Sequence, residues 1–173
     1  QRLGSKDAKV ADLGTGSGAI AIALARSNPG WHITAVDISK GALQLAQLNA
    51  QEQQANNIEF SLASWCDGLA ANQYDMIAAN PPYVQLGDNY LEKGVLLFEP
   101  KIALITDSAG LGSLRRIISQ SKRVLKKDAW LLLEHGFNQQ ASLKALLLTE
   151  GFDSVLGYKD YTGNDRMVCA HWS

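Results

Sequence analysis

The stretch Val10-Ala-Asp-Leu-Gly-Thr-Gly-Ser-Gly18 decides the fold, because an apolar strand runs directly into a turn that carries three glycines. Residues 18–27 follow with helical character and stop at Asn28-Pro29-Gly30. Glycines let a ligand approach the backbone at such a strand-to-helix turn. The spacing departs from the dinucleotide fingerprint G-x-G-x-x-G, because Gly18 follows Gly16 by two residues rather than three. The turn therefore predicts a nucleoside site and argues against NAD.

Apolar runs that read as strands alternate with helical segments along the rest of the chain, which is typical of a parallel sheet covered on both faces. We expect strands at 9–13, 32–37, 58–63, 74–79, 129–133, 152–158 and 166–172. We expect helices at 18–27, roughly 40–54, 111–125 and 141–150. In the second helix, one side is predicted to carry Ala42, Leu45, Ala46 and Asn49. The predicted fold class is doubly wound α/β.

The composition bounds the class of protein. With 173 residues and 46% hydrophobic content, the chain is expected to form one domain with a sizeable core. A net charge of -1 and a pI near 6.3 provide no global positive field, so direct nucleic-acid binding is disfavoured. Cys66 and Cys169 form no metal or redox motif, which suits a reducing cytoplasm. No apolar run is long enough to predict a membrane span, and the start at Gln1 predicts a fragment.

Two further strand ends carry polar residues that suit ligand binding. Asp37 closes the second predicted strand, where a carboxylate can accept both hydroxyls of a ribose. Asn80-Pro81-Pro82-Tyr83 follows the fourth, and its two prolines make the turn rigid. The Asn80 carboxamide and the Pro81 carbonyl can accept hydrogen bonds, while Tyr83 adds a flat wall. This turn predicts a slot that aims a planar, weakly nucleophilic NH2 group at an electrophile. Residues 84–101 lack periodicity, and we expect them to form a lid or binding loop.

These motifs resemble class I S-adenosylmethionine-dependent methyltransferases over nearly the whole chain: Asp12-x-Gly14-x-Gly16-x-Gly18, Asp37 and Asn80-Pro81-Pro82-Tyr83. Three more are similar to the HemK/PrmC family, the N5-glutamine methyltransferases of peptide chain release factors: Phe98-Glu99-Pro100-x-x-Ala103-Leu104, Glu134-His135-Gly136 and Asp160-Tyr161-x-x-Asn164-x-Arg166. The resemblance implies a Rossmann-like, mostly parallel seven-stranded sheet with an antiparallel last strand. It also implies that residues 1–173 are the catalytic domain, without a helical N-terminal domain that helps engage the release factor.

The resemblance implies S-adenosylmethionine as cofactor and no metal. The glycine turn would pass the methionine end, Asp37 would hold the ribose, and Ser64-Trp65 would flank the adenine. The implied cofactor-binding residues are Asp12, Gly14, Thr15, Gly16, Gly18, Asp37, Ile38, Ser64, Trp65 and Asn80, and the implied catalytic residues are Asn80, Pro81, Pro82 and Tyr83. The family commonly has an acidic residue where Ser64 stands, and Asp67 is a candidate substitute.

The implied reaction methylates the glutamine of the Gly-Gly-Gln loop in class 1 release factors, carried out by a cytoplasmic enzyme that we expect to be monomeric. Three alternatives stay open: a glutamine of a large-subunit ribosomal protein, the N6 amine of adenine in DNA or RNA, and a non-catalytic nucleotide-binding module. His135 follows a strand end, where it either borders the site or bonds structurally. A group of basic residues predicts a solvated face, with a ribosomal or RNA-bound partner surface as the alternative: Arg115, Arg116, Lys122, Arg123, Lys126 and Lys127.

Overall fold

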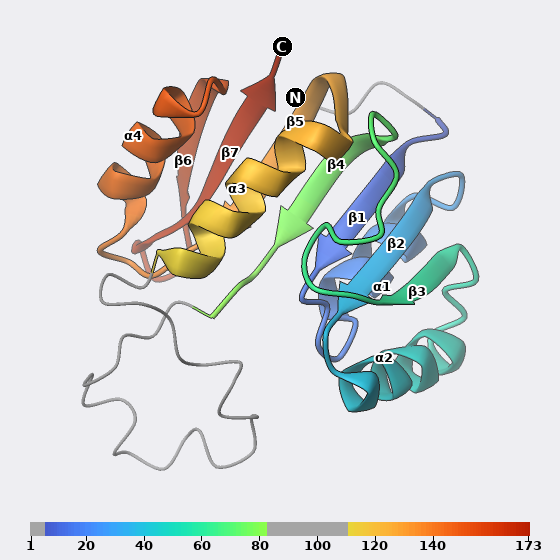
Figure 1. The fold of residues 1–173 in the computed structure, drawn as a ribbon. Helices are drawn as coiled ribbons and strands as arrows, with labels where there is room; N and C mark the ends of the chain where they lie inside the picture. The colour runs from blue at the N-terminus through green and yellow to red at the C-terminus, as the bar shows by residue number, and fades with distance from the viewer. Residues whose placement is uncertain (1–5, 83–110) are drawn as a thin grey trace.

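The computed structural model describes residues 6–82 and 111–173, and Tyr83 and the segment 84–101 therefore lie outside the described residues. The elements alternate along the chain as expected for an α/β domain (Figure 1). They are β1 (Lys9–Leu13), α1 (Ala19–Ser27), β2 (His32–Asp37), α2 (Lys40–Glu52), β3 (Ile58–Leu62), β4 (Tyr74–Ala79), α3 (Gly112–Val124), β5 (Leu125–Glu134), α4 (Gln140–Thr149), β6 (Asp153–Lys159) and β7 (Asp165–Trp172).

The strands form a 7-stranded sheet in the order β3-β2-β1-β4-β5-β7-β6. Strands β1 to β5 pair in parallel, whereas β7 runs antiparallel to both of its neighbours, β5 and β6. The order reverses direction at β1, from which the chain first builds outward to β3 and then crosses back to β4. Ligands of open α/β sheets bind at such a switch point, outside the carboxyl ends of the strands. The expected fold class is confirmed, including the antiparallel last strand.

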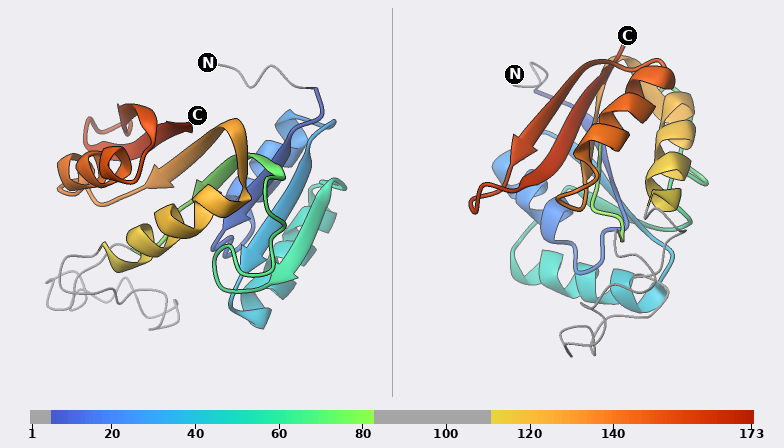
Figure 2. Two further views of the ribbon diagram at one scale, coloured as in Figure 1. Left: turned by 45° about the horizontal axis from the view of Figure 1, so that its top comes forward. Right: turned by 90° about the vertical axis from the view of Figure 1, so that its left-hand side faces the viewer.

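Helices cover both faces of the sheet, α1 and α2 over β1, β2 and β3 and, on the other face, α3 and α4 over β5, β6 and β7 (Figure 2). Two hydrophobic clusters fill the spaces between these layers. Because strand side chains alternate between faces, Val10 packs toward α1 while its neighbour Ala11 packs toward α3. Both are fully buried, so β1 lies in the centre of the molecule.

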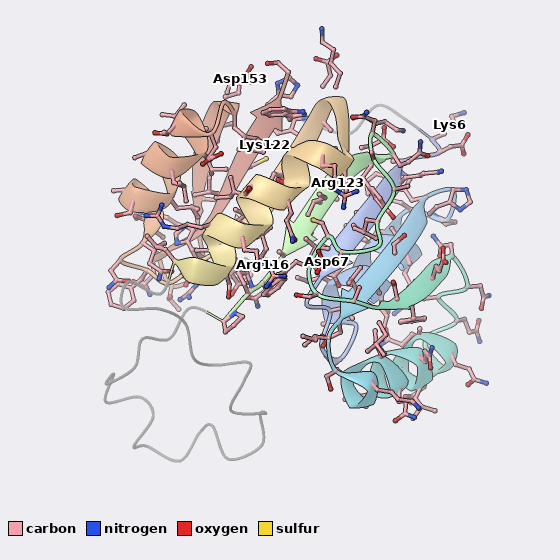
Figure 3. All side chains as sticks on the ribbon, viewed as in Figure 1. Lys6, Asp67, Arg116, Lys122, Arg123 and Asp153 are labelled. Carbon is pink, nitrogen blue, oxygen red and sulfur yellow. The ribbon has the colours of Figure 1, made fainter. Side chains whose placement is uncertain are left out.

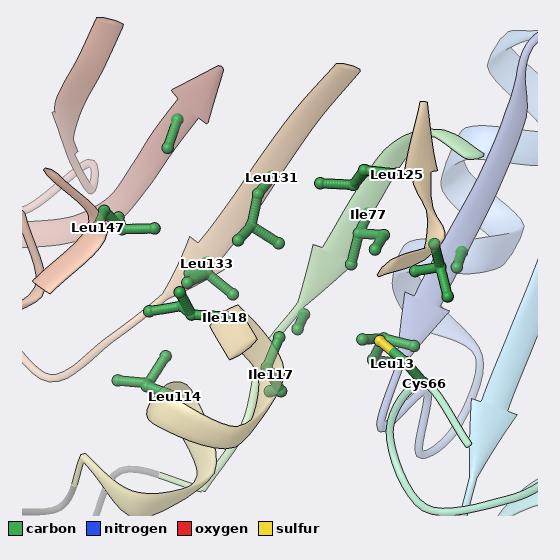
Figure 4. Close-up of a cluster of buried hydrophobic side chains, with 14 of the residues drawn as sticks. Leu13, Cys66, Ile77, Leu114, Ile117, Ile118, Leu125, Leu131, Leu133 and Leu147 are labelled. Carbon is green, nitrogen blue, oxygen red and sulfur yellow. The ribbon is translucent and has the colours of Figure 1, made fainter. Parts of the chain in front are cut away.

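Helix α3 forms because its apolar residues recur at helical spacing. Leu114, Ile117 and Ile118 are completely buried against β4 and β5, as Figure 4 shows for Ile77, Leu131 and Leu133. Burial of each large aliphatic side chain stabilises the fold by about 1.5–3 kcal/mol. The helix ends at Val124 because the next residue, Leu125, is already extended and pairs with Tyr74.

Two details differ from the sequence expectation. The buried residues of α2 are Leu43, Ala46 and Ala50, whereas Leu45 is 49% exposed. Ala46 was predicted correctly and contacts Gly18, but the buried face includes Leu43 and Ala50 in place of Leu45, while Ala42 and Asn49 are half-buried. Leu125 begins β5 rather than ending α3, and its side chain is buried in the same core either way.

The basic residues near α3 are largely used inside the molecule. Lys122 pairs with Glu150 at 2.6 Å, and Lys126 pairs with Asp75 at 2.8 Å. Arg123 donates to two backbone carbonyls, as described below. Arg115 and Lys127, the other members of this group with Arg116, are exposed. No described helix is long and apolar enough to cross a membrane.

Candidate functional site

The carboxyl ends of four adjacent strands bring the predicted site residues to one edge of the sheet. The register pairs Leu13 of β1 with Val36 of β2 and with Ala79 of β4. On the outer side it pairs Asp37 of β2 with Leu62 of β3. The residues that follow these strand ends are the glycine turn, Ile38, the segment 63–65 and Asn80. The lower edge of the sheet in Figure 1 is therefore where both predicted half-sites meet.

The glycine turn is held by backbone hydrogen bonds to the neighbouring strand. The N–H groups of Gly14 and Thr15 both donate to the carbonyl of Val36, at 2.8 and 2.9 Å. Gly16 has φ 56°, and a Cβ built there would meet no atom within 4 Å. The open space above Gly16 is what a ligand needs to reach the backbone. Gly18, at φ 84°, instead has Ala46 of α2 only 3.1 Å from such a Cβ, so it is needed for packing.

Asp12 lies beneath this turn and is 1% exposed. Its Oδ2 accepts hydrogen bonds from the Thr15 hydroxyl at 2.6 Å and the Ala21 N–H at 3.1 Å. Its Oδ1 is buried and, within the part of the chain that the structure describes, has no hydrogen-bond partner. Burial raises the pKa of the Asp12 carboxyl from 3.8 to about 6, against the lowering effect of these two hydrogen bonds. A carboxylate placed at this desolvation cost favours a cationic group near the turn.

Asp37 joins the glycine turn to helix α2. One carboxylate oxygen accepts the Gly16 N–H at 2.9 Å, and the other accepts the Ser39 N–H at 2.8 Å. Ser39 in turn caps α2 by accepting the Ala42 N–H at 3.2 Å. Each carboxylate oxygen keeps a further lone pair, so Asp37 can still accept a pair of hydroxyls. Beside it, Ile38 is 68% exposed and offers an apolar surface.

The segment after β3 places Trp65 against the glycine turn. The edge of the Trp65 ring lies 3.2 Å from where a Cβ on Gly14 would stand, so a side chain there would push the ring away by a few tenths of an ångström. Ser64 and Trp65 are both half-buried. Asp67, the candidate acidic substitute for Ser64, contacts Gln120 at 3.0 Å and Arg116 at 3.4 Å on α3 through its carboxylate. The sequence could not reveal this because the partners lie far along the chain.

The Asn80 turn has a different character. Asn80 is exposed, Pro81 is buried and Pro82 is half-buried at the end of β4. Among residues 6–82 and 111–173, the Asn80 carboxamide has no hydrogen-bond partner. Tyr83, the last member of the predicted catalytic set, lies outside the described residues.

Strand β5 continues the edge beside Asn80, because Ala79 pairs with Leu133 and Glu134 follows it. Burial raises the pKa of Glu134, and nearby Arg166 opposes that shift. His135 is fully buried, with Nδ1 2.8 Å from the Gly136 carbonyl, whereas its Nε2 has no hydrogen-bond partner among the described residues. The described residues contain no group of three or more His, Cys, Asp or Glu side chains able to hold a metal ion.

Known proteins share both the fold and the sequence pattern. Residues 1–99 match the family described as methyltransferase small domain. Release factor glutamine methyltransferase of Salmonella typhimurium is 38% identical over 172 residues, which is 99% of this chain and 62% of that protein. The protein of the same name from Pseudomonas aeruginosa is 42% identical over 171 residues, again 99% of this chain and 62% of the relative. The chain thus spans less than two thirds of the length of these relatives.

Among solved structures, a ribosomal protein L11 methylase from Lactobacillus delbrueckii subsp. bulgaricus superposes with a TM-score of 0.72 at 21% identity, covering 99% of this chain and 74% of that one. The strand order, with one antiparallel strand, and the glycine turn at the switch point define the class I methyltransferase fold. The chain belongs to the methyltransferase small domain family.

Proposed function

We propose that this domain transfers a methyl group from S-adenosylmethionine to the side-chain nitrogen of the glutamine in the Gly-Gly-Gln loop of class 1 peptide chain release factors. The observation that carries the proposal is the exposed Asn80 carboxamide, which has no hydrogen-bond partner among the described residues and follows the strand next to the open glycine turn. The relatives that bear the name release factor glutamine methyltransferase, at 38% and 42% identity, support the choice of substrate. The cell compartment that fits this substrate is the cytoplasm, and a monomer suffices for the reaction.

The residues at the edge of the sheet fit the cofactor. The space above Gly16 would admit a ligand close to the backbone, where a side chain would intrude. The unpaired oxygen of Asp12 places negative potential beneath the turn, which suits the ammonium and sulfonium groups. Asp37 would hold the ribose hydroxyls, and the exposed Ile38 and the Trp65 ring offer apolar surfaces to the adenine. Gly14, Thr15, Gly18 and Ser64 would complete this half of the site.

When bound, S-adenosylmethionine supplies a methyl group on a sulfonium, which is a good leaving group. The protein must then orient a poor nucleophile, because an amide nitrogen shares its lone pair with the carbonyl. The Asn80 side-chain oxygen and the Pro81 carbonyl each accept one N–H of the substrate amide and turn its lone pair toward the methyl. These hydrogen bonds strengthen as the nitrogen becomes positive, which is stabilisation of the transition state. One of the two protons leaves to water after the N–C bond has formed.

The turn itself does not distinguish a glutamine amide from the exocyclic amine of adenine, because both are planar NH2 groups. The contacts of the basic residues near α3 argue against a nucleic-acid substrate, since Arg116, Lys122 and Lys126 are all ion-paired within the domain. Tyr83 would form an apolar wall of the slot, as the sequence motif implies, with Pro82 keeping the turn rigid.

The test is methylation of intact release factor by the 173-residue chain with S-adenosylmethionine, followed by mass spectrometry of the Gly-Gly-Gln peptide. We expect one added methyl group on the glutamine. Asn80→Ala should lower the turnover number by about 100-fold, equivalent to roughly 3 kcal/mol of lost transition-state stabilisation. Arg115→Ala is the matched control, because Arg115 is exposed on α3 and is not among the proposed site residues, and its rate should stay within about twofold of the parent rate, about 0.4 kcal/mol.

The same assay separates the alternatives. Label in a large-subunit ribosomal protein, or in adenine of RNA or DNA, with none in release factor would replace the proposed substrate. Binding of S-adenosylmethionine by calorimetry without transfer to any of these substrates would favour a nucleotide-binding module.

A further inference from the structure

Trp65 adopts a backbone conformation that an L-residue rarely takes. Its φ is 51°, in the left-handed region, and such a conformation costs about 1–3 kcal/mol for a residue other than glycine. The ring of the same residue lies over Gly14 of the proposed cofactor site, 3.2 Å from where a Cβ on that glycine would stand. A residue with a strained backbone needs neighbouring contacts that stabilise this conformation of Trp65.

Helix α3 supplies those contacts to three of the four residues that follow Trp65. Arg123 donates from its two terminal nitrogens to the carbonyls of Cys66 and Leu69, both at 2.8 Å. Gln120 accepts the Cys66 N–H at 3.1 Å and donates to the Asp67 carboxylate at 3.0 Å. The segment between β3 and β4 runs beside α3 in Figure 1, and Figure 3 shows Arg116 and Asp67 close together with Arg123 further along the helix.

The core holds this segment from its other side. Cys66 is completely buried and Leu69 is 5% exposed, and both belong to the cluster between the sheet and α3. Figure 4 shows Cys66 beside Leu13, the last residue before the glycine turn. The backbone immediately after Trp65 is thus fixed by buried side chains on one side and by charged and amide hydrogen bonds on the other.

The bonding residues form a stripe of their own on α3. Arg116, Gln120 and Arg123 recur at helical spacing, separate from the apolar face of Leu114, Ile117 and Ile118 that packs the helix onto the sheet. Arg123 is exposed apart from these contacts. The apolar face alone packs α3 onto the sheet. The hydrogen bonds of Arg116, Gln120 and Arg123 therefore act mainly on the segment after Trp65.

We propose that Arg123 and Gln120 are positioning residues that fix Trp65 against the Gly14 turn and thereby set the affinity for the adenosine part of the cofactor. This inference rests on the proposed function for its ligand. A ring held in place before the ligand arrives spares the entropy of ordering it on binding. Arg123 acts only through the segment, and it is remote from Asn80, where the chemistry would occur. Loss of its hydrogen bonds should therefore raise the KM for the cofactor and leave the turnover number nearly unchanged.

The first measurement compares Arg123→Ala, Arg123→Lys and the control Arg115→Ala in the 173-residue chain. Because Arg123 makes two hydrogen bonds as a charged donor, Arg123→Ala should raise the Kd for S-adenosylhomocysteine about tenfold. The kcat at saturating cofactor should change less than about twofold. Arg123→Lys should recover part of the loss, because a lysine can reach one carbonyl but not two. Equal affinities for all three variants would overturn the proposal.

A double-mutant cycle separates positioning from general destabilisation. In a Trp65→Ala background, Arg123→Ala should have no further effect on affinity, because nothing remains to be positioned. Full additivity of the two losses would overturn the proposal. The emission of Trp65, taken as the difference from Trp65→Phe, should shift to the red in Arg123→Ala without any ligand. An unchanged spectrum would contradict the positioning role even if the parent chain failed to bind cofactor, a failure that would count against the proposed function instead.

Discussion

The glycine turn and the Asn80 turn stand on adjacent strands of one sheet, yet they are built in opposite ways. In the glycine turn nearly every polar group is engaged: Asp37 accepts two N–H groups, Val36 accepts two, and Asn49 of α2 donates to the Ser17 carbonyl at 2.9 Å. At the other turn, Asn80 is exposed and its side chain, within the described residues, bonds to nothing. The glycine turn is bonded into the fold. The Asn80 turn instead presents an exposed carboxamide next to two prolines.

The difference implies that stability and function separate along this edge. Changes in the glycine turn should alter the free energy of unfolding together with cofactor affinity. Changes in the Asn80 turn should alter the rate while leaving the fold nearly intact. Active sites commonly keep unpaired polar groups that a purely structural design would remove.

The strongest test within the glycine turn compares Gly18→Ala with Gly16→Ala. Both positions have positive φ, which costs about 1–2 kcal/mol for alanine. At Gly18 the new methyl also meets the Cβ of Ala46 and the Cδ1 of Ile22 at 3.1 Å, and such overpacking adds about 1–3 kcal/mol. Urea denaturation should therefore show a loss of about 2–5 kcal/mol for Gly18→Ala and about 1–2 kcal/mol for Gly16→Ala.

Cofactor affinity should rank the same two variants differently. Gly16→Ala fills the open space that the ligand needs, so it should weaken binding by at least about tenfold although it destabilises less. If Gly16→Ala bound S-adenosylhomocysteine as tightly as the parent chain, the open space would not be the ligand's path.

A second test concerns the buried carboxyl of Asp12 and its pH dependence. Its pKa is raised from 3.8 to about 6 on folding, so the folded state binds the proton more tightly. The carboxyl therefore adds stability below about pH 4, and this contribution is lost as the pH rises through about 6. Asn can accept the same hydrogen bonds from Thr15 and Ala21 without a charge. Asp12→Asn should exceed the parent chain in unfolding free energy by up to about 3 kcal/mol at about pH 8.

Denaturant unfolding of both proteins at several values between about pH 4 and pH 8 would measure this difference. The gap should close toward the acid end of this range, where the carboxyl of the parent chain is protonated. A constant gap, or an Asp12→Asn variant that is less stable than the parent at the alkaline end, would mean that the Asp12 charge is not costly to bury. Affinity for S-adenosylmethionine should fall in the same variant, since the negative potential beneath the turn is gone.

Much of this edge could be predicted from the sequence because its signals are local. The glycine turn, Asp37 and Asn80 each follow an apolar run directly, and parallel strands bring such ends to one edge. The order of the strands, by contrast, came from resemblance to a family, because periodicity does not say which strands pair. The contacts of Asp67 with α3 and the hydrogen bond from Arg123 to the Cys66 carbonyl could not be predicted, since residues so distant in sequence meet only through the tertiary fold.

The face of α2 shows a second kind of limit. Alanines and leucines occur on more than one side of this helix, so spacing alone offered several apolar stripes of similar quality. Ala46, which contacts Gly18 across the turn, belongs to both the predicted and the observed stripe, so it does not distinguish them. Packing against the sheet makes the choice, because it leaves Leu43 only 7% exposed and Leu45 49% exposed.

The smallest expected effect tests the rigidity of the Asn80 turn. Pro82→Ala frees one φ angle and adds an N–H, which should lower the free energy of unfolding by only about 0.5–1 kcal/mol through the unfolded chain. The turnover number should fall by about threefold, or about 0.6 kcal/mol, because the Pro81 carbonyl is then less firmly aimed. Pro29→Ala in the exposed loop after α1 is the control, with a similar loss of stability and no loss of rate. A Pro82→Ala enzyme with full turnover would show that this carbonyl needs no rigid support, and the contrast between the two turns would then depend on Asn80 alone.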